Sequence, residues 1–210
     1  MSDLYSVFLK LEGKPCLVVG GGSVSTRKVE ILLSSGAKVR VVSPSFDAKL
    51  LEHAKANKNL SLDEKKFEAK DLAEMTLVIA ATNDRRVNRQ VFECAKTLGL
   101  MVNVADEPDL CDFYLPSLLK RGPLTIAVST GGACPALAKK IRQSLEKQFD
   151  ARYEALAGAL SEIRQELIKK YPDDTKKRGS LMAKLVDTIT IDKMSPCSKE
   201  DLIIELRKWI

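Results

Sequence analysis

A cluster of glycines at residues 20–22 narrows the possible folds of this chain more than any other stretch. It follows the apolar run Cys16–Val19 and precedes a helical pattern, which is the order of a strand, a phosphate-binding turn and a helix. Gly20 allows a tight turn, Gly22 lets the backbone approach a pyrophosphate, and Ser25 takes the place of the third glycine of G-x-G-x-x-G. The stretch therefore predicts a dinucleotide-binding loop; the alternative is an ordinary glycine turn in an α/β protein.

Strand and helix patterns alternate through the first half of the chain. We expect strands at Cys16–Val19, Lys38–Val42, Leu60–Lys66, Thr76–Ala81 and Met101–Val104, and helices at Val24–Ser35, Phe46–Asn57 and Arg85–Leu98. This alternation predicts an α/β fold with a Rossmann-type doubly wound parallel sheet and helices on both faces. Ligands of such sheets bind beyond the carboxyl ends of the strands.

The pattern changes after Asp106. We expect a polar loop at 107–113, a short helical turn at Leu115–Lys120, a strand at Leu124–Val128 and a helix at Pro135–Gln148. Three more helices are predicted at Ala151–Lys170, Lys184–Ile191 and Ser198–Trp209, with breaks at residues 171–174 and at Ser195-Pro196. Ser198 followed by Asp201 resembles a capping pair at the start of the last helix.

The bulk composition is that of a globular protein. No apolar run approaches the roughly 20 residues of a membrane span, and the N-terminus lacks the pattern of a signal peptide. We therefore expect a cytoplasmic protein with no membrane partner. The cysteines at positions 16, 94, 111, 134 and 197 include no C-x-x-C pair and are expected to be reduced thiols.

Positive charge is concentrated in the second half of the chain. Residues 1–110 hold 16 Lys and Arg against 15 Asp and Glu, whereas residues 111–210 hold 18 against 13, within a net charge of +6. This imbalance suggests an anionic partner. Because acidic residues interrupt the basic ones and aromatic residues are scarce, a polycarboxylate small molecule fits better than a nucleic acid.

Two further loops are expected beside the glycine cluster at the cofactor edge of the sheet. Ser43 and Pro44 follow the second strand, where an NAD-specific site usually has Asp or Glu, so the residues alone do not separate NAD from NADP. Arg40 can in principle attract a 2′-phosphate, although solvent exposure alone explains a charged residue there. Thr82 and Asn83 can contact the nicotinamide ribose; alternatively, Asn83 or Asp84 caps the next helix.

Asp106 comes directly after the fifth strand. A carboxylate near the reactive end of the cofactor can remove a proton while a hydride leaves, so Asp106 is the candidate general base. The alternative role is a loop cap. Asp109 and Asp112 are expected to be solvated.

A second glycine turn, Ser129-Thr130-Gly131-Gly132, precedes the helix at Pro135. Its backbone N–H groups can take a substrate carboxylate, with a purely structural turn as an equal alternative. Basic side chains flank it at Arg121, Lys139, Lys140 and Arg142, and any of them can pair with a carboxylate.

The single histidine, His53, excludes two kinds of site. It lies on the second expected helix, far from the strand-end loops, and is interpreted as a surface residue. Neither a Ser-His-Asp system nor a histidine-rich metal site can be built from this chain, so no metal ligands are predicted. Cys111 and Cys134 lack ligand spacing and are interpreted as incidental thiols.

Five blocks in order carry a family resemblance. They are residues 18–28 with the glycine loop, Ala80–Asp84, Asn103–Asp106, Phe113–Ser117, and Ala127–Gly132 followed by Pro135–Ala138. Together they resemble the precorrin-2 dehydrogenase / sirohydrochlorin ferrochelatase family of sirohaem synthesis, over about residues 4–150.

The resemblance implies an activity and a set of site residues. Family members use NAD to oxidise precorrin-2 to sirohydrochlorin, and some also insert Fe2+ to give sirohaem. The essential aspartate of the family matches Asp106. Thr130 matches a hydroxyl that is phosphorylated in some members. The cofactor contacts match Gly20, Gly22, Ser23, Val24, Ser43, Pro44, Thr82 and Asn83, and the substrate turn matches Ser129, Thr130, Gly131 and Gly132.

The resemblance also implies a homodimer of three-part chains. An NAD-binding Rossmann domain would occupy residues 1–112, a dimerisation region 113–150 and a helical C-terminal domain 151–210. Two other functions are compatible with the glycine loop: a non-enzymatic NAD-sensing regulatory module, and a chelatase without redox activity. A sensor leaves the second glycine turn and the basic helical tail unexplained, and an intact Gly20 and Gly22 argue against the loss of redox function.

Overall fold

The computed structural model describes residues 4–189 and 198–210. The chain divides into two compact units, Met1–Tyr114 and Leu115–Ile210. The expected break at Ser195-Pro196, Cys197 and the last residues of the helix expected at Lys184–Ile191 lie outside the described residues. Within the described ranges, no helix combines the length and apolar character needed to cross a membrane.

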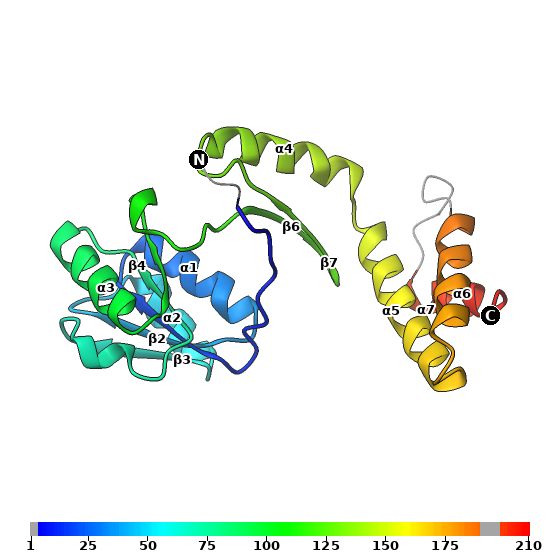
Figure 1. The fold of residues 1–210 in the computed structure, drawn as a ribbon, viewed down its shortest axis with the longest axis horizontal. Coiled ribbons are helices and arrows are strands. Elements are labelled where there is room, and N and C mark those ends of the chain that lie inside the picture. The colour runs from blue at the N-terminus through cyan, green and yellow to red at the C-terminus, as the bar shows by residue number, and fades with distance from the viewer. Residues whose placement is uncertain (1–3, 190–197) are drawn as a thin grey trace. The chain divides into compact units, whose positions relative to one another are not determined.

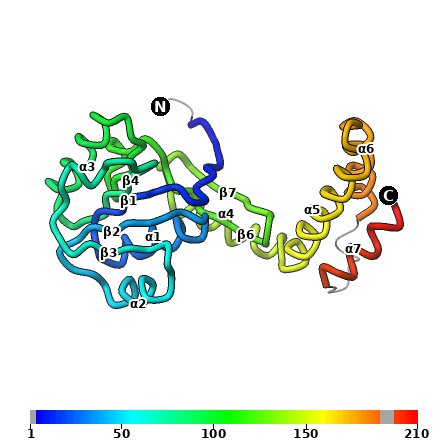
Figure 2. Tube along the Cα trace, turned by 90° about the horizontal axis from the view of Figure 1, so that it is seen from below, coloured from blue at the N-terminus to red at the C-terminus, as the bar shows by residue number. Residues whose placement is uncertain are grey.

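The first unit contains a five-stranded parallel sheet in the order β3-β2-β1-β4-β5 (Figures 1 and 2). The strands are β1 (Pro15–Val19), β2 (Lys38–Ser43), β3 (Leu60–Glu64), β4 (Leu77–Ala80) and β5 (Met101–Val104). All five predicted strands are therefore confirmed, with small differences at their ends. The continuous apolar sequence of β4 is fully buried because it is a central strand covered on both faces.

Helices cover both faces of this sheet, as predicted. The helices are α1 (Ser23–Ser34), α2 (Ala48–Ala56) and α3 (Arg85–Thr97). The first packs on β1 and β2, the second on β3, and the third on β4 and β5. Because parallel crossovers are right-handed and the chain moves in opposite directions from the sheet centre, α1 and α2 share one face and α3 takes the other.

The second unit begins with a hairpin that the sequence did not predict. Residues 115–120 were expected to form a helical turn, which is wrong: β6 (Ser117–Arg121) pairs antiparallel with β7 (Leu124–Val128). The apolar residues at the start of this stretch are spaced as they would be in a helix. Pairing with β7 makes the stretch a strand. Gly122, with a φ of 54°, supplies the first central position of the two-residue turn.

A long helix packs against this hairpin. It is α4 (Pro135–Gln148), with the bounds predicted from the sequence, and it lies along β6 (Figure 1). Arg121 caps the C-terminus of α4, because its guanidinium donates hydrogen bonds to the carbonyl oxygens of Phe149 (2.8 Å) and Glu146 (3.5 Å). Arg121 is therefore held by backbone carbonyl groups, whereas the sequence suggested it as a partner for a ligand carboxylate.

Three helices form the rest of the second unit around a core of their own. They are α5 (Arg152–Lys170), α6 (Thr175–Thr188) and α7 (Lys199–Arg207) (Figure 2). The buried residues of their core include Ile163, Leu167, Leu185 and Leu206. The sequence placed the start of α6 at Lys184, which is wrong because Asp174 caps the helix ten residues earlier by accepting from the Lys177 N–H. The capping box of Ser198 and Asp201 is confirmed.

A buried carboxylate holds one edge of the first unit. Asp71 is almost fully buried and accepts from Arg40 Nη2 (2.5 Å), from Lys65 Nζ (2.7 Å) and from the Glu68 N–H (2.9 Å). Burial by itself raises the pKa of Asp71, but the bond from Lys65, the Glu68 N–H and the nearby Arg40 outweigh it and hold the pKa below its ordinary value. The charge network therefore ties β2 to the segment before β4.

Replacement of Asp71 should lower the stability of the first unit. We expect Asp71→Asn to reduce the free energy of unfolding by about 1–3 kcal/mol at neutral pH, because two cations lose a buried partner. Since the folded-state pKa is depressed, this stabilisation is present above the ordinary value of 3.8 and is lost as the pH falls below it. Urea unfolding across pH should show the gap closing in acid. Asp63→Asn, at a half-exposed partner of Arg40, is the control and should change little; equal effects would contradict the prediction.

Candidate functional site

The start of α1 is built to receive an anion. Gly20 has a φ of 118°, which permits the tight turn after β1, and Gly22 stands at the N-cap. The cap makes no side-chain hydrogen bond, and the first turn carries no acidic residue. The neighbouring helices differ, since Asp47 caps α2 and Asp84 caps α3. The N–H groups and partial positive charge at this helix end therefore fit the pyrophosphate of a dinucleotide.

The middle glycine of the cluster has a structural role that sequence reasoning missed. A Cβ at Gly21 would lie far inside contact distance of the Ser45 carbonyl oxygen and 2.9 Å from Ser43 Oγ. The Asp47 N–H also donates to the Gly21 carbonyl (2.8 Å). The G-x-G-x-x-G pattern leaves this position free, so only the packing of the loop after β2 identifies it. A Cβ at Gly22, by contrast, meets nothing within 4 Å, which leaves room for a ligand.

Ser25 fits the third position of the pattern for a physical reason. It is fully buried, and its hydroxyl donates to the Ala81 carbonyl (3.1 Å) just after β4. A small side chain is needed for this close approach, and the hydroxyl finds a partner there. Ser25 therefore lets α1 pack closely on the sheet, as the third glycine of the pattern does.

The loop after β2 shows which groups remain for the adenosine ribose. Ser43 is buried next to the glycine loop, and its hydroxyl lies 3.5 Å from the Ser45 N–H. Arg40 is bound to Asp71 and to Asp63 (3.2 Å). Since its guanidinium is already paired, Arg40 does not favour a 2′-phosphate.

The loop after β4 is held mainly by its own residues. The Thr82 hydroxyl lies 2.8 Å from Asn88 Oδ1, and the Asn88 amide returns a bond to the Thr82 carbonyl (3.1 Å). Asp84 accepts from the Arg86 N–H (2.9 Å), so the capping alternative is correct for Asp84. Asn83 remains exposed and free to meet a ligand. Asn88, a buried polar residue on α3, was missed because its partner lies in the loop.

Asp106 occupies an unusual backbone conformation at the same sheet edge. The Ala105 N–H donates to the Ala80 carbonyl (2.8 Å), which fixes the end of β5 beside β4. Asp106 then has a φ of 61°, and its side chain is exposed. The adjacent Glu107 has a buried Oε1 with no hydrogen-bond partner among the described residues. Non-glycine residues in the left-handed region are uncommon and concentrate at functional sites, which supports the candidate base.

Cys111 and Asp112 both make contacts that hold this edge of the sheet. The Cys111 thiol donates to the Val104 carbonyl (3.2 Å), and burial raises the pKa of Cys111, so it is an unreactive packing group. Asp112 accepts from the Val102 N–H (3.1 Å) and from Lys96 Nζ (2.8 Å). Asp112 is exposed, as expected, but it also anchors the returning chain to β5.

The second glycine turn lies in the other unit and is braced by its hydroxyls. Ser129 Oγ accepts from the Gly131 N–H (3.1 Å), and Thr130 Oγ1 accepts from the Cys134 N–H (3.0 Å) at the start of α4. Gly131 and Gly132 have φ values of 62° and 85°. These contacts explain the turn structurally, and they leave the N–H of Gly132 for a ligand. Of the flanking basic residues, Arg142 pairs with Glu146, whereas Lys139 and Lys140 are exposed.

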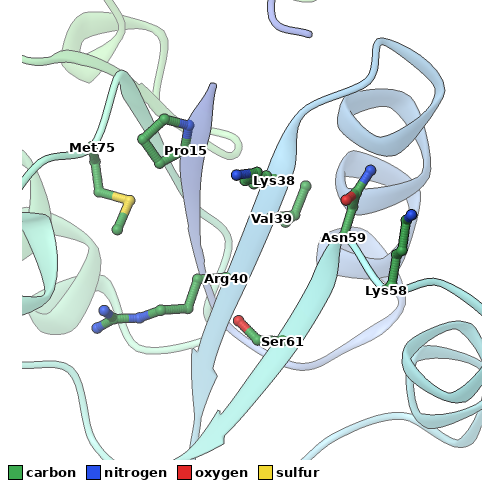
Figure 3. Close-up of a pocket in the computed structure, with 8 residues that line it drawn as sticks. All are labelled: Pro15, Lys38, Val39, Arg40, Lys58, Asn59, Ser61 and Met75. Atoms are coloured by element: carbon green, nitrogen blue, oxygen red, sulfur yellow. The ribbon is translucent and has the colours of Figure 1, made fainter. Parts of the chain in front are cut away.

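A cavity and the single histidine lie away from the carboxyl ends of the strands. A cavity of about 270 Å³ lies at the opposite edge of the sheet, where β1, β2 and β3 begin, and is lined by residues such as Pro15, Lys38 and Asn59 (Figure 3). His53 contacts Glu30 (2.8 Å) between α2 and α1, consistent with its predicted place away from the strand-end loops. In the part of the chain that is described, no cluster of His, Cys, Asp and Glu can hold a metal ion.

Two substitutions should separate the roles of the adjacent glycines. Gly21→Ala places a methyl group against the backbone, so we expect the free energy of unfolding to fall by about 2 kcal/mol. Gly22→Ala should cost less than about 1 kcal/mol, because the site is open and the backbone is ordinary. Its methyl group occupies the space proposed for the pyrophosphate, so NAD affinity should fall. Thermal unfolding and NAD titration of both variants test this contrast; an unchanged melting temperature for Gly21→Ala would refute it.

Comparison with known proteins identifies both units. Residues 7–117 match the family described as "Putative NAD(P)-binding", and residues 121–148 match "Sirohaem biosynthesis protein central". Siroheme synthase of Methylococcus capsulatus is 42% identical over 176 residues, covering 84% of this chain and 37% of that protein. Siroheme synthase of Neisseria meningitidis is 45% identical over 144 residues, covering 69% and 30%. This chain thus spans about a third of the length of these relatives.

A solved structure matches over nearly the whole chain. This structure is "SirC, precorrin-2 dehydrogenase", and its sequence is 29% identical to this chain. The two structures match with a TM-score of 0.74, over 98% of this chain and 100% of that chain. The Rossmann-type fold with a helical C-terminal part and the NAD cofactor are confirmed. The chain therefore belongs to the "Putative NAD(P)-binding" family, and its predicted resemblance to the proteins of sirohaem synthesis is confirmed.

Proposed function

We propose that this protein oxidises precorrin-2 to sirohydrochlorin with NAD, using Asp106 as the general base. The observation that carries the proposal is the exposed carboxylate of Asp106, held at the carboxyl end of β5 in a left-handed turn beside an uncapped dinucleotide loop. The name of the structural relative, precorrin-2 dehydrogenase, supports the choice of substrate. No nucleophile or histidine is required, because removal of a hydride and a proton completes this oxidation.

The residues of the first unit divide the work of this reaction. Bound NAD supplies the hydride acceptor. The α1 N-terminus with Gly20, Gly22, Ser23 and Val24 holds the pyrophosphate, since its N–H groups have no competing cap. Ser43 and Pro44 border the adenosine ribose, and Thr82 and Asn83 border the nicotinamide ribose. Asp106 takes the proton that the substrate carbon releases, and it returns the proton to water afterwards.

The second unit supplies substrate contacts in this proposal. The turn Ser129–Gly132 receives a substrate carboxylate, and the excess of positive charge after residue 110 attracts the polycarboxylate. We propose a homodimer in which residues 113–150 form the dimerisation region, between an NAD-binding domain of residues 1–112 and a helical domain of residues 151–210. The family match of residues 121–148 to a central sirohaem domain supports this division. We also propose that the protein acts in the cytoplasm.

Ferrochelatase activity is a second candidate function. The relatives named siroheme synthase and the presence of Asp106 favour it, because a carboxylate can also take protons from pyrrole nitrogens as Fe2+ enters. The relatives are much longer than this chain, so their complete activity is not carried over. Iron is a substrate in this proposal, and the protein is not assigned a resident metal.

An anaerobic absorbance assay tests both activities. Purified protein is mixed with precorrin-2 and NAD, first without metal and then with Fe2+. NADH formation together with a sirohydrochlorin spectrum supports the dehydrogenase. A metal-dependent spectral change faster than the enzyme-free rate supports the chelatase. Binding of NAD without either change would favour the non-enzymatic sensor instead.

Substitution of Asp106 isolates its role within the same assay. We expect Asp106→Asn to lower the rate of NADH formation by about 10²–10⁴-fold, the usual contribution of a general base. Asn also tolerates the left-handed conformation, so the melting temperature and NAD affinity should stay unchanged. A nearly normal rate in this variant would remove Asp106 from the proposed chemistry.

A further inference from the structure

One lysine beside the proposed base stays without an ion pair. Lys28 on α1 is half-buried, and within residues 4–189 and 198–210 no carboxylate lies close enough to form a salt bridge with it. Four other cations around this sheet have carboxylate partners: Arg40 and Lys65 bind Asp71, Lys96 binds Asp112, and Lys49 binds Glu30. A half-buried cation without a close partner needs an explanation, because burial of charge is unfavourable.

Helix geometry points Lys28 toward Asp106. Glu30 faces α2, where it contacts Lys49 (2.7 Å) and His53 (2.8 Å). Lys28 is two residues earlier, so it lies on roughly the opposite side of the helix. That side also carries Ser25, which touches Ala81 after β4, and β5 follows next to β4. Lys28 therefore faces the turn that carries Asp106.

The charge environment of Lys28 agrees with this placement. Burial and the neighbouring Arg27 lower the pKa of Lys28, whereas the charges of Asp106 and Cys111 act in the opposite direction. The net lowering means that the folded protein disfavours the ammonium form relative to the unfolded chain.

We propose that Lys28 binds a carboxylate of the tetrapyrrole substrate next to Asp106. This inference rests on the proposed function, and it gives the substrate an anchor in the same unit as the base. The ammonium group would form a charge-assisted hydrogen bond with the carboxylate and so orient the reacting carbon toward Asp106.

The position of Lys28 favours a substrate carboxylate over a cofactor phosphate. The residue lies five positions after Ser23, or about 7.5 Å along the helix from its first residue. The pyrophosphate is expected at the free N–H groups of that first turn, so it lies nearer to Gly22 than to Lys28. Both ligands are anions, and separate titrations distinguish them.

Lys28→Met in the full-length protein tests this assignment. The probes are sirohydrochlorin without NAD, followed by absorbance, and NAD without tetrapyrrole. We expect sirohydrochlorin binding to weaken about tenfold, the effect of one lost charge-assisted hydrogen bond. NAD affinity should be unchanged, and the melting temperature equal or higher because an unfavourable buried charge is gone. Lys55→Met, which removes an exposed lysine from α2, is the matched control and should alter none of these.

Each other outcome overturns the inference in a different way. A loss of NAD affinity alone would assign Lys28 to the cofactor phosphate. A lower melting temperature with both affinities unchanged would show that Lys28 only balances the charge of Asp106. Tetrapyrrole binding equal to wild type in Lys28→Met would reject Lys28 alone, whereas no tetrapyrrole binding by the wild-type protein would reject the proposed function itself and Lys28 with it.

Discussion

Backbone hydrogen bonds that continue past the ends of the strands hold the candidate site together. The Gly20 N–H bonds the Val42 carbonyl (2.9 Å), the Ala81 N–H bonds Val19 (2.8 Å), and the Ala105 N–H bonds Ala80 (2.8 Å). These bonds bring the loops after four strands to one edge in fixed register. The glycine loop can approach its neighbours only because Gly20 and Gly21 have no Cβ, so the cofactor loop and the turn of Asp106 depend on the same close packing.

Contacts between distant segments also decide which charged side chains are available to a ligand. Several cations serve the fold, as Arg40 and Lys65 do at Asp71, and Arg121 does at the end of α4. The net positive charge of the chain therefore overstates what is available to a ligand. What remains near the proposed base is Lys28, which sits half-buried with no close counter-ion in the described structure. Net charge suggested an anionic ligand, but only the pairing pattern indicates where it would bind.

Much of the first unit could be predicted because its signals are local. The apolar run of β4 and the bounds of α4 follow from neighbouring residues, and the predicted sheet is confirmed. The hairpin strand β6 could not be predicted, since its apolar spacing is compatible with a helix until β7 pairs with it. The start of α6 was missed because the first turn of this helix is polar and shows no helical spacing of apolar residues. The contact that Asp112 makes was missed because its partner Val102 lies ten residues earlier.

The sequence by itself determined the dinucleotide loop, the alternation of strands and helices, and the carboxylate after the fifth strand, because each is written in adjacent residues. The tertiary structure decided why Gly21 must be glycine, which basic residues are already paired, and that the charge of Asp106 acts on Lys28. It also gave Asp106 its left-handed backbone. These properties arise from contacts between segments far apart in the chain, and no local pattern records which distant atoms will meet.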